Sequence, residues 1–106
     1  MARIDKVDQI VRATAGTALV GTRTVRLNAG GSVIYAGSAD ALGVVCLPGT
    51  ISAGRPVGVL VRGEIVEYGG SAGGTIYSTA GGTLATTSGG TLVGFTVEGD
   101  RLVVTM

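Results

Sequence analysis

The chain has 106 residues, which is enough for one domain with a modest core. Only 14% of the residues are charged and the net charge is +1, so the charge gives no support to a general nucleic-acid binder. Glycine or charge interrupts each apolar stretch well before the roughly 20 residues that a spanning helix needs, so we expect neither a membrane span nor a signal peptide. Apolar residues make up 45% of the chain, and we expect some of their surface to be buried against other subunits or a partner.

The first thirteen residues differ from the rest of the chain. Ile4, Val7, Ile10 and Val11 follow helical spacing, which predicts about three turns of helix that would be marginal alone in water. We therefore expect residues 1–13 to form an arm that is disordered or loosely helical until it docks, and extended or a short helix once ordered, while residues 14–106 form the β-domain. A short helix that caps one end of the β-domain is the alternative.

Charge is uneven along the sequence. Residues 1–26 hold five basic side chains against two acidic ones, and the remainder holds three against five. Two explanations remain open: the charges are scattered over the surface without a role, or a basic arm meets an acidic partner surface.

Glycine punctuates the rest of the chain. Ten of the twenty glycines form pairs, at 30–31, 69–70, 73–74, 81–82 and 89–90. Because glycine enters left-handed backbone conformations freely, Gly-Gly between β-prone segments predicts tight turns. Pro48-Gly49 and Gly54-Arg55-Pro56 predict two more. The segments between them predict strands at 17–20, 23–27, 32–36, 42–47, 56–68, 75–79, 83–87, 91–97 and 101–106.

The longest of these predicted strands alternates between two faces. One face carries Val57, Val59, Val61 and Ile65, and the other carries Leu60, Arg62, Glu64, Val66 and Tyr68, with an interruption at Gly63. This pattern is typical of a half-buried strand.

An eight-residue repeat runs from residue 73 to residue 96. Each of three copies begins Gly-Gly-Thr and continues with an aliphatic residue. A strand of about five residues and a short turn fit this period, which favours a β-meander. A solenoid would need the period to extend over most of the chain.

The chain contains few residues of the types that catalyse reactions or bind metals. The chain has no histidine, and its one cysteine, Cys46, lies in an apolar run typical of a buried free thiol in a reducing cytosol. The carboxylates form no convincing pair, and the glycine-rich segment 69–74 lacks the Gly-Lys-Ser/Thr of a phosphate loop. We therefore expect no catalytic residue, no cofactor and no metal site, and no enzyme activity.

From residue 37 onward the chain resembles the small capsid decoration, or cement, proteins of tailed phages. The matching segments are Leu42-Gly43-Val44-Val45, Ser52-Ala53-Gly54, Val57 to Glu64, Ala72 to Tyr77, Val93-Gly94-Phe95 and Arg101-Leu102-Val103-Val104. The resemblance implies an all-β protein, a small β-barrel or sandwich, that forms homotrimers on the outer surface of the phage head.

That role implies the major capsid protein as the partner and the virion surface as the location, after assembly in the host cytoplasm. It requires no direct contact with nucleic acid or membrane. The candidates for contact with the capsid are the apolar and basic residues of the arm, namely Arg3, Ile4, Lys6, Val7, Ile10, Val11 and Arg12. Another virion component, such as a tail or fibre module, and a carbohydrate-binding β-domain are the alternative functions.

Overall fold

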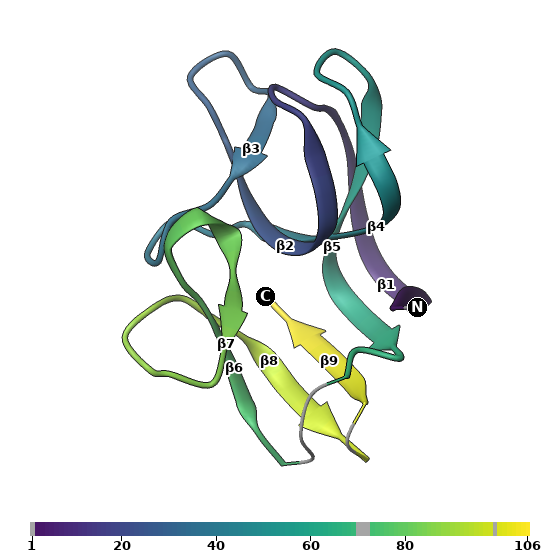
Figure 1. Cartoon of the computed structure of the whole chain (residues 1–106), viewed down its shortest axis with the longest axis vertical. Helices are drawn as coiled ribbons and strands as arrows, with labels where there is room; N and C mark the ends of the chain where they lie inside the picture. Colours follow the sequence, from purple (N-terminus) through teal and green to yellow (C-terminus); the bar gives the residue numbers. More distant parts are fainter. Residues whose placement is uncertain (1, 70–72, 99) are drawn as a thin grey trace.

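Nine antiparallel strands form one strongly curled, half-barrel sheet in the computed structural model, which describes residues 2–69, 73–98 and 100–106 (Figure 1). The strands are β1 (Arg3–Thr14), β2 (Leu19–Leu27), β3 (Val33–Tyr35), β4 (Gly43–Ile51), β5 (Pro56–Val66), β6 (Thr75–Ser78), β7 (Leu84–Ala85), β8 (Leu92–Val97) and β9 (Arg101–Thr105). One short 3-10 turn, η1 (Ala80–Gly82), precedes β7, and no α-helix occurs among the described residues.

The strand order divides the sheet into two lobes. The order is β3-β2-β4-β5-β9-β8-β6-β7, and β1 pairs with the remaining edge of β5. We call β1 to β4 and the start of β5 the N-terminal lobe, and the end of β5 with β6 to β9 the C-terminal lobe. The two lobes lie at opposite ends of the long axis (Figure 1).

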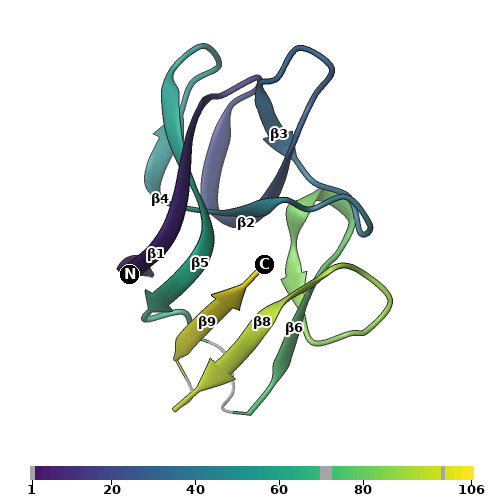
Figure 2. The same cartoon turned by 180° about the vertical axis from the view of Figure 1, so that it is seen from behind.

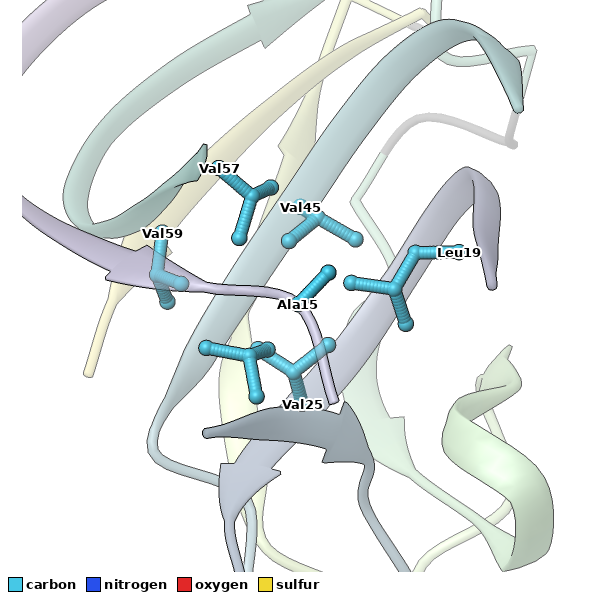
Figure 3. Packing of buried hydrophobic residues seen from close by; sticks show 7 residues of the cluster. Ala15, Leu19, Val25, Val45, Val57 and Val59 are labelled. Atoms are coloured by element: carbon cyan, nitrogen blue, oxygen red, sulfur yellow. The ribbon is translucent and has the colours of Figure 1, made fainter. Parts of the chain in front are cut away.

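Each lobe has its own core, and β4 and β5 contribute to both. The N-terminal core contains Val45 and Val59, which point toward Ala15, Leu19 and Val25 (Figure 3). The C-terminal core contains the neighbouring residues, Val44 and Leu60, together with residues such as Ile65 and Leu102. Consecutive side chains of a strand point to opposite faces, so these two strands form the wall between the cores.

The predicted strands are confirmed in position, with changes in length. The segments 17–20 and 23–27 form one continuous strand, β2, and 83–87 shortens to the two residues of β7. The glycine pairs at 30–31, 81–82 and 89–90 lie between strands as expected, and so does the turn at Gly54, whereas Gly70 lies outside the described residues. The turn expected at Pro48-Gly49 is wrong, because both residues lie within β4, beside an irregularity in its pairing with β2.

The predicted β-meander is also wrong. The repeat supplies three strands, β6, β7 and β8, but β8 pairs with β6 and β9 and makes no ladder with β7. The order β7-β6-β8 places the first copy of the repeat in the middle. A hydrogen bond from the Ser78 amide to the Thr91 carbonyl (2.9 Å) holds the start of β8 beside the end of β6, and one from the Thr91 amide to the Ser38 carbonyl (2.5 Å) ties it to the loop after β3.

The helical alternative for the N-terminal arm is wrong, and the extended alternative is what the structure contains. Residues 3–14 form a strand that pairs with β5 from Arg3↔Val66 to Thr14↔Pro56. The pairing shifts register between Ile4 and Lys6 and again between Val7 and Gln9. The helical spacing of Ile4 and Val7 does not put them on one face, because Ile4 packs against the C-terminal core and Val7 is 49% exposed.

A buried pair of hydroxyl groups joins the lobes. Thr24 of β2 and Ser78 of β6 are both fully buried, and their side-chain oxygens lie 2.7 Å apart. The Ser78 hydroxyl also donates to the Gly37 carbonyl at 2.8 Å, so the proton between the two hydroxyls comes from Thr24. The loop after β3 is thereby fastened to both lobes.

Removing one member of this pair leaves a buried polar group without its hydrogen-bond partner. We predict that Thr24→Val and Ser78→Ala each lower the free energy of unfolding by about 1–3 kcal/mol. The double variant should lose less than the sum of the two single losses, because it leaves no hydroxyl without its partner. Urea unfolding of the four proteins tests this, and strictly additive losses would contradict the coupling.

Gly94 of β8 is required by a close approach rather than by a turn. A β-carbon at this position would collide with the carbonyl oxygen of Val103 on β9, whereas a β-carbon at Gly49 would meet no atom within 4 Å. We predict that Gly94→Ala destabilises the fold by about 3 kcal/mol or more, since backbone cannot move aside cheaply. Gly49→Ala is the matched control and should change stability by less than about 0.5 kcal/mol. Equal effects of the two substitutions in thermal unfolding would contradict this packing.

Candidate interaction surfaces

Strand β1 is a long edge strand. Ten of its twelve residues have register partners on β5 along one side, and no other strand of the described chain forms a ladder with its other side. Figure 2 shows β1 running along the outside of the molecule next to β5. An edge of this length offers unpaired backbone donors and acceptors to another chain.

The seven predicted contact residues all lie on β1, and the structure brings six of them to the surface. Val7 and Ile10 are 49% and 40% exposed, and Val11 is similarly exposed. The exception is Ile4, which packs against the C-terminal core. Arg3, Lys6 and Arg12 are exposed, and Arg3 pairs with Glu67 of the turn after β5 at 2.8 Å.

An apolar groove lies beside the point where the curled sheet comes nearest to closing. A single bridge joins Ala15, just after β1, to Val33 of β3, and the Gly16 amide donates to the Val33 carbonyl at 2.7 Å. Next to this bridge is a hollow of about 130 Å³, lined almost wholly by aliphatic side chains. Its walls include Val11, Leu27, Val33, Leu42 and Val61. The sequence analysis did not find this groove, because alternation indicates which residues face inward but not where a curled sheet stays open.

The C-terminal lobe presents two large apolar side chains on its outer face. Leu92 and Phe95 of β8 are 53% and 45% exposed. The pairing of β8 with β6 shifts at this point, so that Val93 and Gly94 are both buried and the residues on either side of them both face outward. Leu92 and Phe95 are therefore candidates for the apolar surface that we expect to be buried against other subunits or a partner.

A second hollow, more polar than the groove, lies between the lobes. It has a volume of about 360 Å³ and is lined by Thr22, Arg23, Tyr68, Gly69, Thr83 and Leu84. Arg23 donates to the Gly81 carbonyl at 3.2 Å and lies 4.9 Å from the centre of the Tyr35 ring. Partial burial raises the pKa of Tyr68, so its hydroxyl remains a neutral donor at ordinary pH.

Several of the other ionisable groups form ion pairs, among them Arg26 and Asp40 at 3.0 Å. Arg101 of β9 binds Glu64 and Glu98, with a nitrogen–oxygen distance of 2.8 Å in each pair. These hydrogen bonds, first that of Glu64 and then that of Glu98, raise the pKa of Arg101. Cys46 is a free thiol, partly buried rather than wholly buried as expected, and it accepts a hydrogen bond from Thr22 at 3.5 Å.

The part of the chain that the structure describes contains no candidate metal site. No three His, Cys, Asp or Glu side chains there lie close enough to hold a metal ion. Within the same residues, no helix is both long enough and apolar enough to cross a membrane.

The chain was also compared with known proteins. Neither the protein-family models nor the curated protein sequences include a match to it. The candidate surfaces are therefore defined by the geometry above.

The opposite orientations of Ile4 and Val7 can be tested by truncation. Ile4→Ala should lower the free energy of unfolding by about 1–3 kcal/mol, because it removes side-chain atoms that pack against the core. Val7→Ala should change it by less than about 0.5 kcal/mol, because that side chain is half in solvent. Chemical denaturation measures both values, and a larger loss for Val7→Ala would contradict the observed face of β1.

Proposed function

We propose that this protein is a structural component of a virion, a capsid decoration protein that associates as a homotrimer and binds the major capsid protein on the outer surface of a phage head. The β-barrel or sandwich of such proteins corresponds, in this proposal, to the half-barrel sheet completed by association. No catalytic residue, cofactor or metal takes part.

The observation that carries the proposal is the exposed edge strand β1. It presents half-exposed aliphatic side chains, Val7 and Ile10, between exposed charged ones such as Lys6 and Arg12. Apolar side chains that interrupt a charged row on a long open edge are typical of a protein–protein contact. The resemblance of residues 37–106 to decoration proteins suggests that the partner is the major capsid protein.

The mechanical demand of the role agrees with the rest of the molecule. A protein that bridges neighbouring capsomers resists expansion of the shell through its binding energy, and it needs a stiff body rather than reactive side chains. The continuous hydrogen-bonded ladder from β3 to β7 supplies that stiffness. In this proposal β1 lies against the shell, and the remaining exposed apolar surface contacts other copies.

The test uses substitutions in place of a deletion. Removing residues 1–13 would uncover the edge of β5 and remove Ile4 from the core, so lost binding would have two explanations. Val7→Ser combined with Ile10→Ser changes half-exposed side chains that belong to neither core, and Val20→Ser on β2 is the control at a similarly exposed valine.

The proteins are mixed with immature and with expanded capsids of the phage that carries the gene, and the bound fraction is measured by sedimentation. We expect the unaltered chain and Val20→Ser to bind expanded capsids. The double variant should bind them at least about tenfold more weakly, because it loses buried apolar area. Equal binding by the double variant would contradict the role of β1. Absence of capsid binding by the unaltered chain would contradict the function.

The polar hollow favours a second candidate, a carbohydrate-binding domain. Thr22, Arg23, Tyr68 and Thr83 offer hydroxyl and guanidinium donors beside an aromatic ring. Binding of the chain to an array of immobilised glycans, abolished by Tyr68→Ala, would favour this function over capsid decoration.

A further inference from the structure

We propose that copies of this chain associate head to tail, with Phe95 and Leu92 of one copy seated in the apolar groove of the next. The inference rests on the self-association in the proposed function and identifies the surfaces that make it. The occupant of the groove is thus a second copy of this chain.

The first argument is the distribution of charge. Residues 9–62 carry five arginines and one acidic residue, a net charge of +4, and residues 63–106 carry four acidic residues and one arginine, a net charge of −3. Because the first range builds most of the N-terminal lobe and the second builds the C-terminal lobe, the two lobes that lie along the long axis (Figure 1) carry net charges of opposite sign. Two copies placed head to tail bring a basic lobe against an acidic one, whereas like ends repel.

The second argument is the placement of apolar surface on the same two lobes. The groove lies in the basic lobe, where Arg26 forms part of its wall, and the half-exposed Phe95 and Leu92 lie on the acidic lobe. The apolar projection and the apolar recess thus lie on lobes of opposite net charge.

The third argument is size. The groove has a volume of about 130 Å³. A protein cavity of roughly 150 Å³ with a similar aliphatic lining binds benzene, so one phenyl ring is the kind of group that the groove can hold. Phe95 is the only phenylalanine of the chain, and it is exposed.

A contact between two different surfaces has a consequence for assembly. Each copy keeps one free groove and one free projection after the first contact, so copies add until the ring closes or a fibre grows. Closure after three copies gives the trimer of the proposed function. A contact of one surface with itself would instead stop at a dimer.

Three substitutions introduce the same acidic group at different exposed positions. Leu42→Asp places a charge at the groove, Phe95→Asp replaces the projection, and Val20→Asp is the control on β2 outside both surfaces. Circular dichroism first checks that each variant keeps its β-structure. Analytical ultracentrifugation then gives the mass of the full-length proteins.

We expect the unaltered chain and Val20→Asp to sediment as the same oligomer. Leu42→Asp and Phe95→Asp should each weaken association by about 10- to 100-fold or more, because each removes apolar burial and places a charge in the contact. Raising the salt from 0.1 M to 1 M should also weaken association of the unaltered chain, since the screening length falls from about 10 Å to about 3 Å.

Mixing the two defective variants gives the decisive result. Phe95 of the Leu42→Asp copy can still enter the intact groove of the Phe95→Asp copy, so the mixture should form a one-to-one heterodimer that neither variant forms alone. A mixture that stays monomeric overturns the head-to-tail contact, and so do variants that keep the mass of the unaltered oligomer.

Capsid binding separates the failure of this inference from that of the proposed function. Oligomers unaffected by Leu42→Asp and Phe95→Asp that still bind expanded capsids would overturn only the head-to-tail contact. An unaltered chain that is monomeric at every concentration and ignores capsids would overturn both.

Discussion

The fold depends on two strands that serve two cores at once. In β5, Val59 packs into the N-terminal core and the next residue, Leu60, packs into the C-terminal core. Strand β4 divides its neighbours Val45 and Val44 in the same way, and Val44↔Leu60 is the register pair at which the two strands meet. The wall between the cores is therefore one layer of backbone, and a change in either core acts on the other through it.

This arrangement explains both the rigidity of the molecule and its open surfaces. A chain of this length divides its aliphatic residues between two small cores, so neither core can be covered on every side. The sheet curls around the N-terminal core and, among the described residues, meets itself at the bridge of Ala15 and Val33, and the apolar groove lies beside that bridge. Strand β1 covers the outer edge of β5 and thereby becomes an edge itself.

The sequence predicted the strands well because glycine and alternation are local signals. Gly-Gly pairs ended strands at 30–31, 81–82 and 89–90 because glycine enters the left-handed turns there, as Gly31, Gly81 and Gly89 do with φ of +82°, +73° and +120°. Partner choice is not local. The repeat in 73–96 gave three equivalent strands, and the hydrogen bonds of Ser78 and Thr91, which set β8 beside β6, involve residues that alternation does not distinguish.

Bulges account for the other differences between expectation and structure. Strand β1 pairs irregularly with β5, so its side chains do not follow the strict alternation by which a strand is recognised in a sequence. In β5 the expected face of Val57, Val59, Val61 and Ile65 is divided, because Ile65 joins Leu60 in the C-terminal core. The pairing with β1 shifts between these two residues, near Gly63, where a β-carbon would collide with the Lys6 carbonyl.

The candidate contact residues were chosen because apolar side chains at helical spacing and basic side chains gather in the first thirteen residues, and six of the seven are exposed on β1 although the helix is wrong. The groove and the Leu92–Phe95 pair were missed because each depends on curvature or on a bulge. The two lobes thus differ in charge and in shape, and the wall formed by β4 and β5 fixes their relative position. That fixed relation is what an assembling structural protein requires of its parts.

The shared wall is tested most directly by amide hydrogen exchange at increasing urea concentration. If β4 and β5 couple the cores, the amides of β2 in one lobe and β8 in the other lose protection at the same urea concentration, in one cooperative transition. Loss of protection in β8 while β2 remains protected, or the reverse, would contradict the coupling of the two cores.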